Sequence, residues 1–442
     1  MEIRFGIQSA EHRTIPSSAQ KMVNCYLEAN VPGSRSQVDI IPAYGVTEFN
    51  DITFPQGANY IADTLYVIGE NGLYTINSAG LETLKVAFNN TGYAQIEGEK
   101  DNLVILDGSN KLYGFDGTTL TALSASLDFS WLGFIDRYWV AIRKDTGAFY
   151  INETEGDFST WNTLDFAVAS SNPDFLRWGI VDKRELILFG DQSTQIYYNS
   201  GDADFPFSVV PNGTIETGIF SKRAAGKIGN AVFFLGHDGI AYQLAGYTPQ
   251  RISNHAFEQA IEGYTKSCKV MVWHESGHAM VGFKFPEGFW VYDLSTQLWH
   301  NRKTYNKDTW DVEFIQFAYR NYYTGGSTLG RLDADVFTDL GDIMRLQCTS
   351  TNISDKMNLI NHDRLELIFE TGQGDAEVML RFSDDGGLTW SNEIWEGMGA
   401  IGNYRDRVLF HQLGSSRDRV YEYSITDNYR RTLMQATLNE WN

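Results

Sequence analysis

The sequence predicts an all-β protein in which an extended amino-terminal arm precedes a β-propeller of six or seven blades and a carboxyl-terminal β-sandwich. The first observation behind this prediction is composition. Aromatic residues make up 14% of the 442-residue chain, and 41 glycines stand against 9 prolines, which is typical of strands and turns. The second observation is a repeat of strand pairs, and the third is a change of strand spacing after residue 340.

Residues 1–50 are predicted to form the arm. The segment has turn formers and one short apolar run, 22–27, followed by the stretches 31–34 and 40–45, and little of it could form a core of its own. We therefore expect extended segments that lie on another surface.

Residues 51–340 carry the repeat. Each unit pairs a short apolar strand with a second strand that carries an aromatic residue, and the units recur roughly every 38–49 residues. Because one such blade cannot bury both faces alone, neighbouring blades must stack in a ring. The alternative is a run of hairpins in one long sandwich. Firm units start at residues 65, 103, 139, 186, 231 and 279, and a weaker seventh unit starts at 322.

Residues 341–442 are predicted to form a separate β-sandwich. Their strand patterns follow one another closely, alternate polar and apolar residues and show no helical period. The patterns lie at 343–350, 364–370, 378–382, 393–395, 408–413, 420–425 and 432–438.

The stretch 381–390 within this sandwich reads as a β-hairpin with an acidic tip. It also fits an Asp box, a hairpin motif of sialidases and other propellers in which Asp and Ser/Thr oxygens bind local backbone N–H groups. The residues at the Asp-box positions are Ser383, Asp385, Gly387, Thr389 and Trp390.

A sialidase would repeat the box across several blades and add an arginine cluster for the substrate carboxylate, with a tyrosine nucleophile and its glutamate partner. This chain has one box, outside the propeller repeats, and Arg13-Thr14-Ile15-Pro16 matches the sialidase Arg-Ile-Pro motif only loosely. The box is therefore interpreted as a device that shapes the hairpin, with a sialidase-like glycosidase as the enzymatic alternative.

His274-Glu275-Ser276-Gly277-His278 matches the HExxH pattern of zinc proteases. That chemistry needs both histidines on one face of a helix, with the glutamate placed as general base. Here the flanking residues, 270–273 and 279–282, have strand patterns, and glycine is a poor helix former. We expect a hairpin loop with splayed side chains instead of a zinc site.

No other motif predicts catalysis or cofactor binding. Gly325-Gly326-Ser327-Thr328-Leu329-Gly330 has the glycines of a phosphate loop, but it opens no helix and no Lys-Ser/Thr follows. Cys25, Cys268 and Cys348 are isolated thiols without a CxxC pair, which argues against a disulfide framework and a zinc site. The sequence thus predicts no catalytic, cofactor-binding or metal-binding residues and no cofactor.

The net charge of −21 argues against a protein that grips nucleic acid, because such proteins gather Lys and Arg into patches. The basic pairs Arg417/Arg419 and Arg430/Arg431 are short and lie among acids. The amino terminus lacks the pattern of a signal peptide, and no stretch is apolar enough for a membrane span. We expect synthesis in a reducing cytoplasm.

Four segments together resemble one known family. They are Val23-Asn24-Cys25-Tyr26 with Pro32-Gly33-Ser34, the element from Gly325 to Asp333, the run Glu370-Thr371-Gly372-Gln373-Gly374 leading to Ser383-Asp384-Asp385-Gly386-Gly387, and the stretch from Arg407 to Val420. The chain is similar in these segments, and in the order arm, propeller, sandwich, to the tail hub or nozzle proteins of short-tailed bacteriophages, often labelled packaged DNA stabilization proteins. It departs from them at Pro42-Ala43-Tyr44-Gly45, where the family usually has a Thr-Pro-Gly turn.

The resemblance implies a structural virion protein of the tail, assembled in the bacterial host cytoplasm. It implies a homo-oligomeric ring, with six copies the expected number, below the portal and its adaptor and around the channel through which DNA leaves the head. The arm and sandwich would contact neighbouring subunits and the adaptor, and DNA would be a passing cargo. A propeller that binds a carbohydrate or a protein is the alternative from another class.

Overall fold

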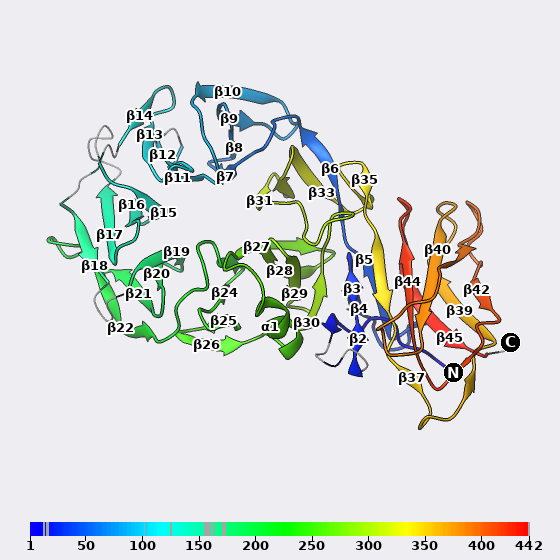
Figure 1. The fold of residues 1–442 in the computed structure, drawn as a ribbon. Helices are drawn as coiled ribbons and strands as arrows, with labels where there is room; N and C mark the ends of the chain where they lie inside the picture. Colours follow the sequence, from blue (N-terminus) through cyan, green and yellow to red (C-terminus); the bar gives the residue numbers. More distant parts are fainter. Residues whose placement is uncertain are drawn as a thin grey trace.

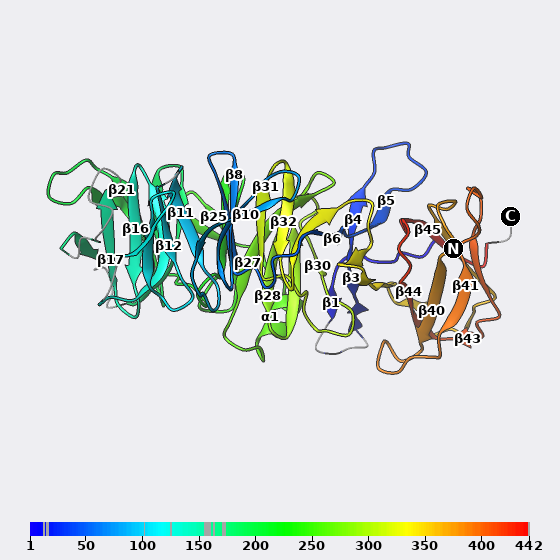
Figure 2. The ribbon, with the colours of Figure 1, turned by 90° about the horizontal axis from the view of Figure 1, so that it is seen from above.

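The computed structural model describes residues 1–11, 14, 17–100, 102–123, 126–153, 161, 164–169 and 174–440. These residues are almost all strand or turn, with one short helix, α1 (His255–Ile261), so the predicted all-β class is confirmed. Figure 1 shows a ring of small sheets beside a sandwich that holds both chain termini. Figure 2, seen from above, shows that the sandwich extends the propeller disc sideways and leaves both faces of the disc uncovered by it.

Five four-stranded antiparallel sheets follow one another along the chain, each with its strands paired in chain order. Blade one has β7 (Gly57–Ile61), β8 (Thr64–Gly69), β9 (Gly72–Ile76) and β10 (Glu82–Ala87); blade two has β11 (Gln95–Glu99), β12 (Asn102–Leu106), β13 (Leu112–Phe115) and β14 (Leu120–Ala122). Blade three has β15 (Phe129–Ile135), β16 (Tyr138–Arg143), β17 (Ala148–Glu153) and β18 (Phe166–Val168); blade four has β19 (Leu176–Asp182), β20 (Glu185–Gly190), β21 (Thr194–Asn199) and β22 (Phe207–Ile215). Blade five has β23 (Ala225–Ile228), β24 (Ala231–Leu235), β25 (Ala241–Ala245) and β26 (Thr248–Arg251).

Two further blades borrow strands from the start of the chain. Blade six has β27 (Lys269–Glu275), β28 (His278–Phe285), β29 (Gly288–Asp293) and β30 (Leu298–Asn301). Blade seven has β31 (Phe314–Ala318), β32 (Asn321–Gly325) and β33 (Leu329–Asp333), and its fourth strand is β6 (Gly45–Asn50), paired antiparallel with β33. The first strands of the seven blades contact one another in a closed cycle from β7 round to β31 and back. The described fold is therefore a seven-bladed propeller, and not one long sandwich.

The turns between the first and second strands repeat from blade to blade. In blades one, three, four, six and seven both turn residues have positive φ, as two-residue type I′ hairpin turns require. Most of these residues are not glycine, so the turns give little signal in the sequence. They are Ala62-Asp63, Asp136-Arg137, Lys183-Arg184, Ser276-Gly277 and Tyr319-Arg320.

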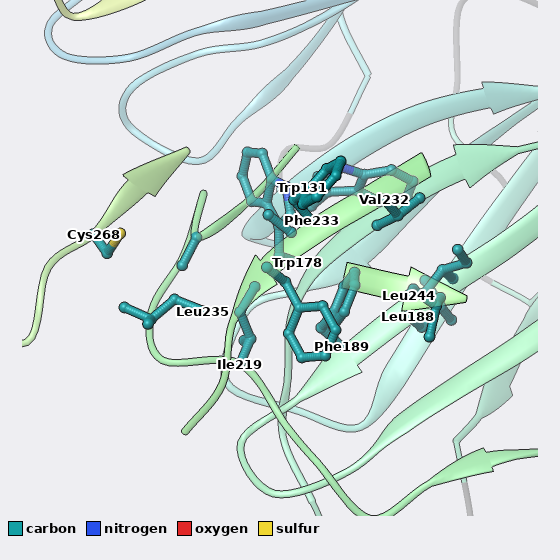
Figure 3. Packing of buried hydrophobic residues seen from close by; sticks show 14 of the residues in the cluster. Trp131, Trp178, Leu188, Phe189, Ile219, Val232, Phe233, Leu235, Leu244 and Cys268 are labelled. Atoms are coloured by element: carbon teal, nitrogen blue, oxygen red, sulfur yellow. The ribbon is translucent and has the colours of Figure 1, made fainter. Parts of the chain in front are cut away.

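Adjacent blades pack through large apolar side chains. Figure 3 shows Trp131 of β15 and Trp178 of β19 among side chains from blades four and five. A Cβ on Gly133 would lie 2.2 Å from the Trp131 ring, and a Cβ on Gly179 would lie 2.9 Å from it. Glycine at these two first-strand positions therefore makes room for the indole, whose burial contributes about 3 kcal/mol of hydrophobic stabilisation.

The sandwich consists of two sheets that also use amino-terminal strands. One sheet has the order β4 (Cys25–Ala29), β5 (Val38–Pro42), β45 (Leu433–Leu438), β39 (Arg364–Phe369) and β42 (Val408–His411). The other contains β36 (Leu346–Thr349), β44 (Asp418–Ile425), β40 (Glu377–Ser383) and β41 (Ile394–Gly397), with β37 (Ile353–Ser354) beside β44. β3 (Met22–Val23) lies between β30 and β36, so this second sheet is continuous with blade six.

Short strand pairs complete the fold. They are β1 (Ala10–Glu11) with β2 (Ala19–Gln20), β34 (Thr338–Asp339) with β35 (Asp342–Ile343), and β38 (Ile360–Asn361) with β43 (Ser415–Ser416). The strands of residues 1–50 thus enter both blade seven and the sandwich. The division into units at residues 50 and 340 stays a prediction. Of the loose match at 13–16, residues 13, 15 and 16 lie outside the described residues.

Candidate functional site: the propeller–sandwich joint and the axial clasp

The HExxH-like residues lie at the tip of the β27–β28 hairpin. Ser276 and Gly277 form the turn, and Glu275 lies directly opposite His278 across the two strands. Because side chains alternate between the faces of a strand, His274 points to one face of the sheet while Glu275 and His278 point to the other. The expected hairpin is present, and its geometry keeps the two histidines apart.

Glu275 belongs to a buried cluster that joins the propeller to the amino-terminal strands. Its Oε1 accepts hydrogen bonds from Arg302 Nη1 at 2.9 Å and from the backbone N–H of Tyr44 at 3.1 Å, and Arg302 also donates to the Tyr44 carbonyl. The Arg302 guanidinium lies 3.9 Å over the Trp310 ring. Burial raises the pKa of Glu275, and Arg302 opposes that shift. Removing either partner would leave an unpaired charge in the core.

His278 is held on the same face by Asp293. His278 Nδ1 lies 2.7 Å from Asp293 Oδ2, and Thr296 Oγ1 donates to the same oxygen at 2.8 Å. The Asp293 hydrogen bond raises the pKa of His278, whereas burial lowers the pKa of nearby His300 to about 3. Among the described residues, no cluster of three or more His, Cys, Asp or Glu side chains could hold a metal ion.

Asn24 connects the propeller to the sandwich immediately after β3. Its φ of 56° is left-handed, a conformation that asparagine adopts more readily than most residues. Its Nδ2 donates to the carbonyls of Lys303 and Arg345, both at 2.9 Å, and its Oδ1 accepts from the Lys303 N–H at 3.0 Å. Lys303 follows blade six and Arg345 precedes β36, so one side chain fixes the two parts to each other. We call the Glu275–Arg302 cluster together with Asn24 the joint.

A second candidate site lies where the first strands of blades two, five and seven begin. Tyr93 precedes β11, Arg223 precedes β23 and Glu313 precedes β31. The Arg223 guanidinium lies 3.4 Å over the Tyr93 ring, and Arg223 Nη2 donates to the Glu313 carbonyl at 2.7 Å. These three residues, which we call the axial clasp, span one end of the ring of first strands.

The axial clasp sits on a constrained backbone and is supported by ion pairs. Arg223 has a φ of 65°, which costs a residue other than glycine on the order of 1–3 kcal/mol. Lys284 Nζ lies 2.7 Å from the Glu313 carboxylate, and Lys269 pairs with its other oxygen. Burial acts to raise the pKa of Glu313, but the two lysines prevail and lower it to about 2.

The Asp-box residues shape a turn in the sandwich. Asp385 Oδ1 accepts from Ser383 Oγ at 2.6 Å and from the Thr389 N–H at 2.9 Å, and Ser383 Oγ accepts from the Gly387 N–H at 2.8 Å. These hydrogen bonds, the one from Ser383 first, lower the pKa of Asp385. The Trp390 ring lies 4.7 Å from the Arg381 guanidinium. All of the box's local oxygens are thus engaged in the hairpin.

The glycine-rich stretch at 325–330 lies between β32 and β33 and opens no helix. A Cβ on Gly325 would lie 2.0 Å from the Phe314 ring, so this glycine serves close packing. Residues 326–328 line a cavity of about 260 Å³, and the charged residues of its lining are all acidic. They are Glu48, Asp311, Asp339 and Asp342. An acidic lining repels phosphate.

Comparison with protein families gives the decisive observation. The family model described as "Bacteriophage P22 Gp10, beta-propeller" matches residues 18–337, and "Bacteriophage P22 Gp10, beta-sandwich" matches residues 345–439. The chain belongs to the bacteriophage P22 Gp10 family. The predicted resemblance to phage tail hub proteins is thereby confirmed, as is the order of propeller and sandwich. Membership of the P22 Gp10 family makes the chain a structural tail component of a virion that assembles with other tail proteins.

A search of solved structures finds similarities at low identity and low TM-score. A computationally designed protein, Ika8, is 11% identical with a TM-score of 0.38, and covers 65% of this chain and 99% of its own. The WD40 domain of Neurospora crassa Pan2 is 9% identical with a TM-score of 0.43. The match covers 65% of this chain and 94% of that domain. An extracellular domain from B. thetaiotaomicron is 10% identical with a TM-score of 0.45, over 86% of this chain and 58% of that domain. No curated protein matches the sequence.

The joint and the axial clasp were not predicted from the sequence. Arg302 and Tyr44 are 258 positions apart, so no local pattern connects them. One signal was available, because Glu275 follows the apolar run 270–273 and a charge there needs a buried partner. No helix of the described residues is long and apolar enough to cross a membrane.

Proposed function

We propose that this protein is the tail hub, or nozzle, subunit of a short-tailed phage. Six copies close a ring below the portal and its adaptor, enclose the DNA exit channel and help to retain packaged DNA. The observation that carries the proposal is the P22 Gp10 family match, which extends over both the propeller and the sandwich.

The charge of the chain supports a channel role. The net charge is −21, and acidic walls do not form the multiple phosphate contacts that would hold DNA in place. DNA in this proposal is a passing cargo, retained by the closed tail assembly and not by a tight binding site.

The axial clasp supports a DNA path between copies. Arg223 reaches from blade five to Tyr93 of blade two and to Glu313 of blade seven, across one end of the individual propeller. The Arg223 contacts with Tyr93 and Glu313 lie across the space between the first strands, so they obstruct a path for DNA through the individual propeller. The lumen of the proposed ring is therefore the space that the copies enclose together.

The shape of the chain supports a head-to-tail ring. The sandwich lies beside the propeller disc, so the two ends of the molecule are unlike (Figure 2). A contact between unlike surfaces closes into a ring when its rotation permits. The adaptor and other tail proteins would bind the rims of that ring.

The experiment that tests the proposal is negative-stain microscopy with native mass measurement of the purified chain, alone and with its adaptor. The proposal predicts closed rings with a central hole and a mass of six copies. A strict monomer under every condition, with and without adaptor, would overturn it.

We also propose that the protein has no catalytic role. Zinc analysis and a peptidase assay of the purified chain test this point at the β27–β28 hairpin. Stoichiometric zinc and hydrolysis, both lost on His278→Ala, would restore the protease reading. If the purified chain hydrolysed sialosides and lost that activity on Asp385→Ala, the glycosidase alternative would return.

A further inference from the structure

Two of the three cysteines meet in the core of the sandwich. Cys25 opens β4 in one sheet, and Cys348 lies in β36 of the other. Both are fully buried in the same apolar cluster, and both are free thiols. β4 and β36 contact each other, and Cys25 Sγ lies 3.7 Å from the carbonyl oxygen of Gln347, the residue before Cys348. The sequence showed 322 residues between them and gave no sign of a pair.

The surroundings of the two thiols are unusually polar for a core. Arg431 is fully buried, and its Nη atoms donate to three backbone carbonyls, those of Met344, Ile425 and Asp427. Within the part of the chain that the structure describes, its Nε has no hydrogen-bond partner. Burial lowers the pKa of Arg431 to about 10. Burial raises the pKa of the Cys348 thiol, so the thiolate that disulfide exchange requires forms rarely while the pair stays in the core.

A disulfide between Cys25 and Cys348 would have a large effect on the stability of the fold because of where the two cysteines lie. Cys25 follows Asn24 of the joint, and Cys348 lies two residues after Leu346, where β36 begins. A covalent link between them would close a loop that contains the entire propeller. A link across so long a loop restricts the unfolded chain strongly.

We propose that Cys25 and Cys348 are a disulfide-forming pair that fastens the joint once the protein leaves a reducing compartment. The oxidant is a small-molecule disulfide such as oxidised glutathione. One cysteine thiolate attacks it and releases one small thiol, and the second cysteine attacks the mixed disulfide and releases the other. Two protein thiols are oxidised to one disulfide, one small disulfide is reduced to two thiols, and the two protons end on the released thiols.

The amino-terminal segment controls access to the pair. Gly6 lies against Cys348, since a Cβ on this residue would lie 2.6 Å from the Cys348 sulfur. Oxidation of the folded chain therefore requires that the segment around residues 3–6 lifts, and we expect it to be slow. Oxidation during refolding avoids this barrier. The inference does not depend on ring formation, so it can fail or hold independently of the proposed function.

The test is thiol counting on the full chain, refolded with a glutathione mixture and with dithiothreitol in parallel. After denaturation with N-ethylmaleimide, the oxidised sample should carry one label, on Cys268, and the reduced sample three. Peptide mapping should find Cys25 joined to Cys348. The melting temperature of the oxidised chain should be higher by about 5 °C.

Two variants keep the test decisive. Cys268→Ser should retain the disulfide and the shift of melting temperature, because Cys268 lies in the propeller core and not in the sandwich. Cys25→Ser should abolish both while it leaves the reduced melting temperature little changed. Three labels after oxidative refolding, a disulfide that includes Cys268, or glutathione adducts without an internal bond would overturn the proposal.

Discussion

At the scale of single residues, the joint depends on a buried ion pair. Glu275 and Arg302 are both fully buried, so Arg302→Met leaves a carboxylate without its partner. We predict a loss of about 3–5 kcal/mol in the free energy of unfolding. Urea denaturation followed by tryptophan fluorescence measures it.

A matched control is available at an exposed pair. Arg184 pairs with Asp136 at 2.9 Å, but its side chain is 79% exposed. Arg184→Met should therefore leave the denaturation midpoint almost unchanged. Equal losses in the two variants would contradict the role given to the joint.

Buried histidines predict an acid-sensitive fold. Burial lowers the pKa of His300 to about 3 and that of His362 to about 4, against an ordinary 6.5. Below pH 6.5 the unfolded chain therefore binds more protons than the folded one, so stability that is present above pH 6.5 is lost as pH falls toward 4. His278 acts in the opposite sense, because its raised pKa contributes stability below pH 6.5 that is lost at higher pH.

We predict that the melting temperature falls between pH 6.5 and pH 5, a window in which most carboxylates stay charged. Differential scanning calorimetry checks this. His362→Asn should flatten the curve, whereas His255→Asn, at an exposed position, should not. A melting temperature independent of pH in this window would contradict the account.

The Asp box makes a third prediction at this scale. Asp385→Ala removes the hydrogen bonds from Ser383 and Thr389, so the melting temperature should fall by about 2 °C. The exposed neighbour Leu388→Ala, which leaves those bonds intact, is the control. If the Asp385→Ala variant had the same melting temperature as the parent protein, the structural role of the Asp box would be contradicted.

At the scale of elements, the amino-terminal strands decide whether the rest can fold. β6 completes blade seven, and β4 and β5 belong to a sandwich sheet. Deletion of residues 1–50 should therefore abolish cooperative melting of the whole chain, because both units lose a paired strand. Circular dichroism and limited proteolysis check this. A truncated chain that melts cooperatively would show that these residues are only a dispensable arm.

The axial clasp gives a second prediction at this scale. Arg223→Ala and Arg223→Gly both lose the contact with Tyr93, but only glycine tolerates the φ of 65° without strain. The alanine variant should be less stable than the glycine variant by about 1 kcal/mol. Hydrogen exchange in β11 and β31 should be faster in both. Equal stabilities with unchanged exchange would contradict the clasp.

Part of the fold could be predicted from the sequence because some strands are short continuous runs of apolar residues. The strand pairs recognised there are the second and third strands of each blade, such as β8 with β9 and β12 with β13, which are apolar and buried. First strands mix polar residues and glycines, as in Gln95–Glu99, and fourth strands such as Glu82–Ala87 are exposed. The fourth strand of blade seven comes from residues 45–50, and such long-range pairing leaves no local pattern.

At the scale of the whole molecule, the account is that of a rigid tail building block. β3 makes blade six and one sandwich sheet continuous, so hydrogen-bonded strands connect the propeller to the sandwich. The clasped propeller and the net charge of −21 support the proposed ring, in which DNA passes without a tight binding site.

The most direct measurement is an electron-microscopy reconstruction of the assembled phage tail. The account predicts six copies of a seven-bladed disc with an attached sandwich, arranged around the DNA axis below the portal, so that DNA runs between the discs. A single disc centred on the DNA axis, or the absence of this fold from the tail, would contradict it.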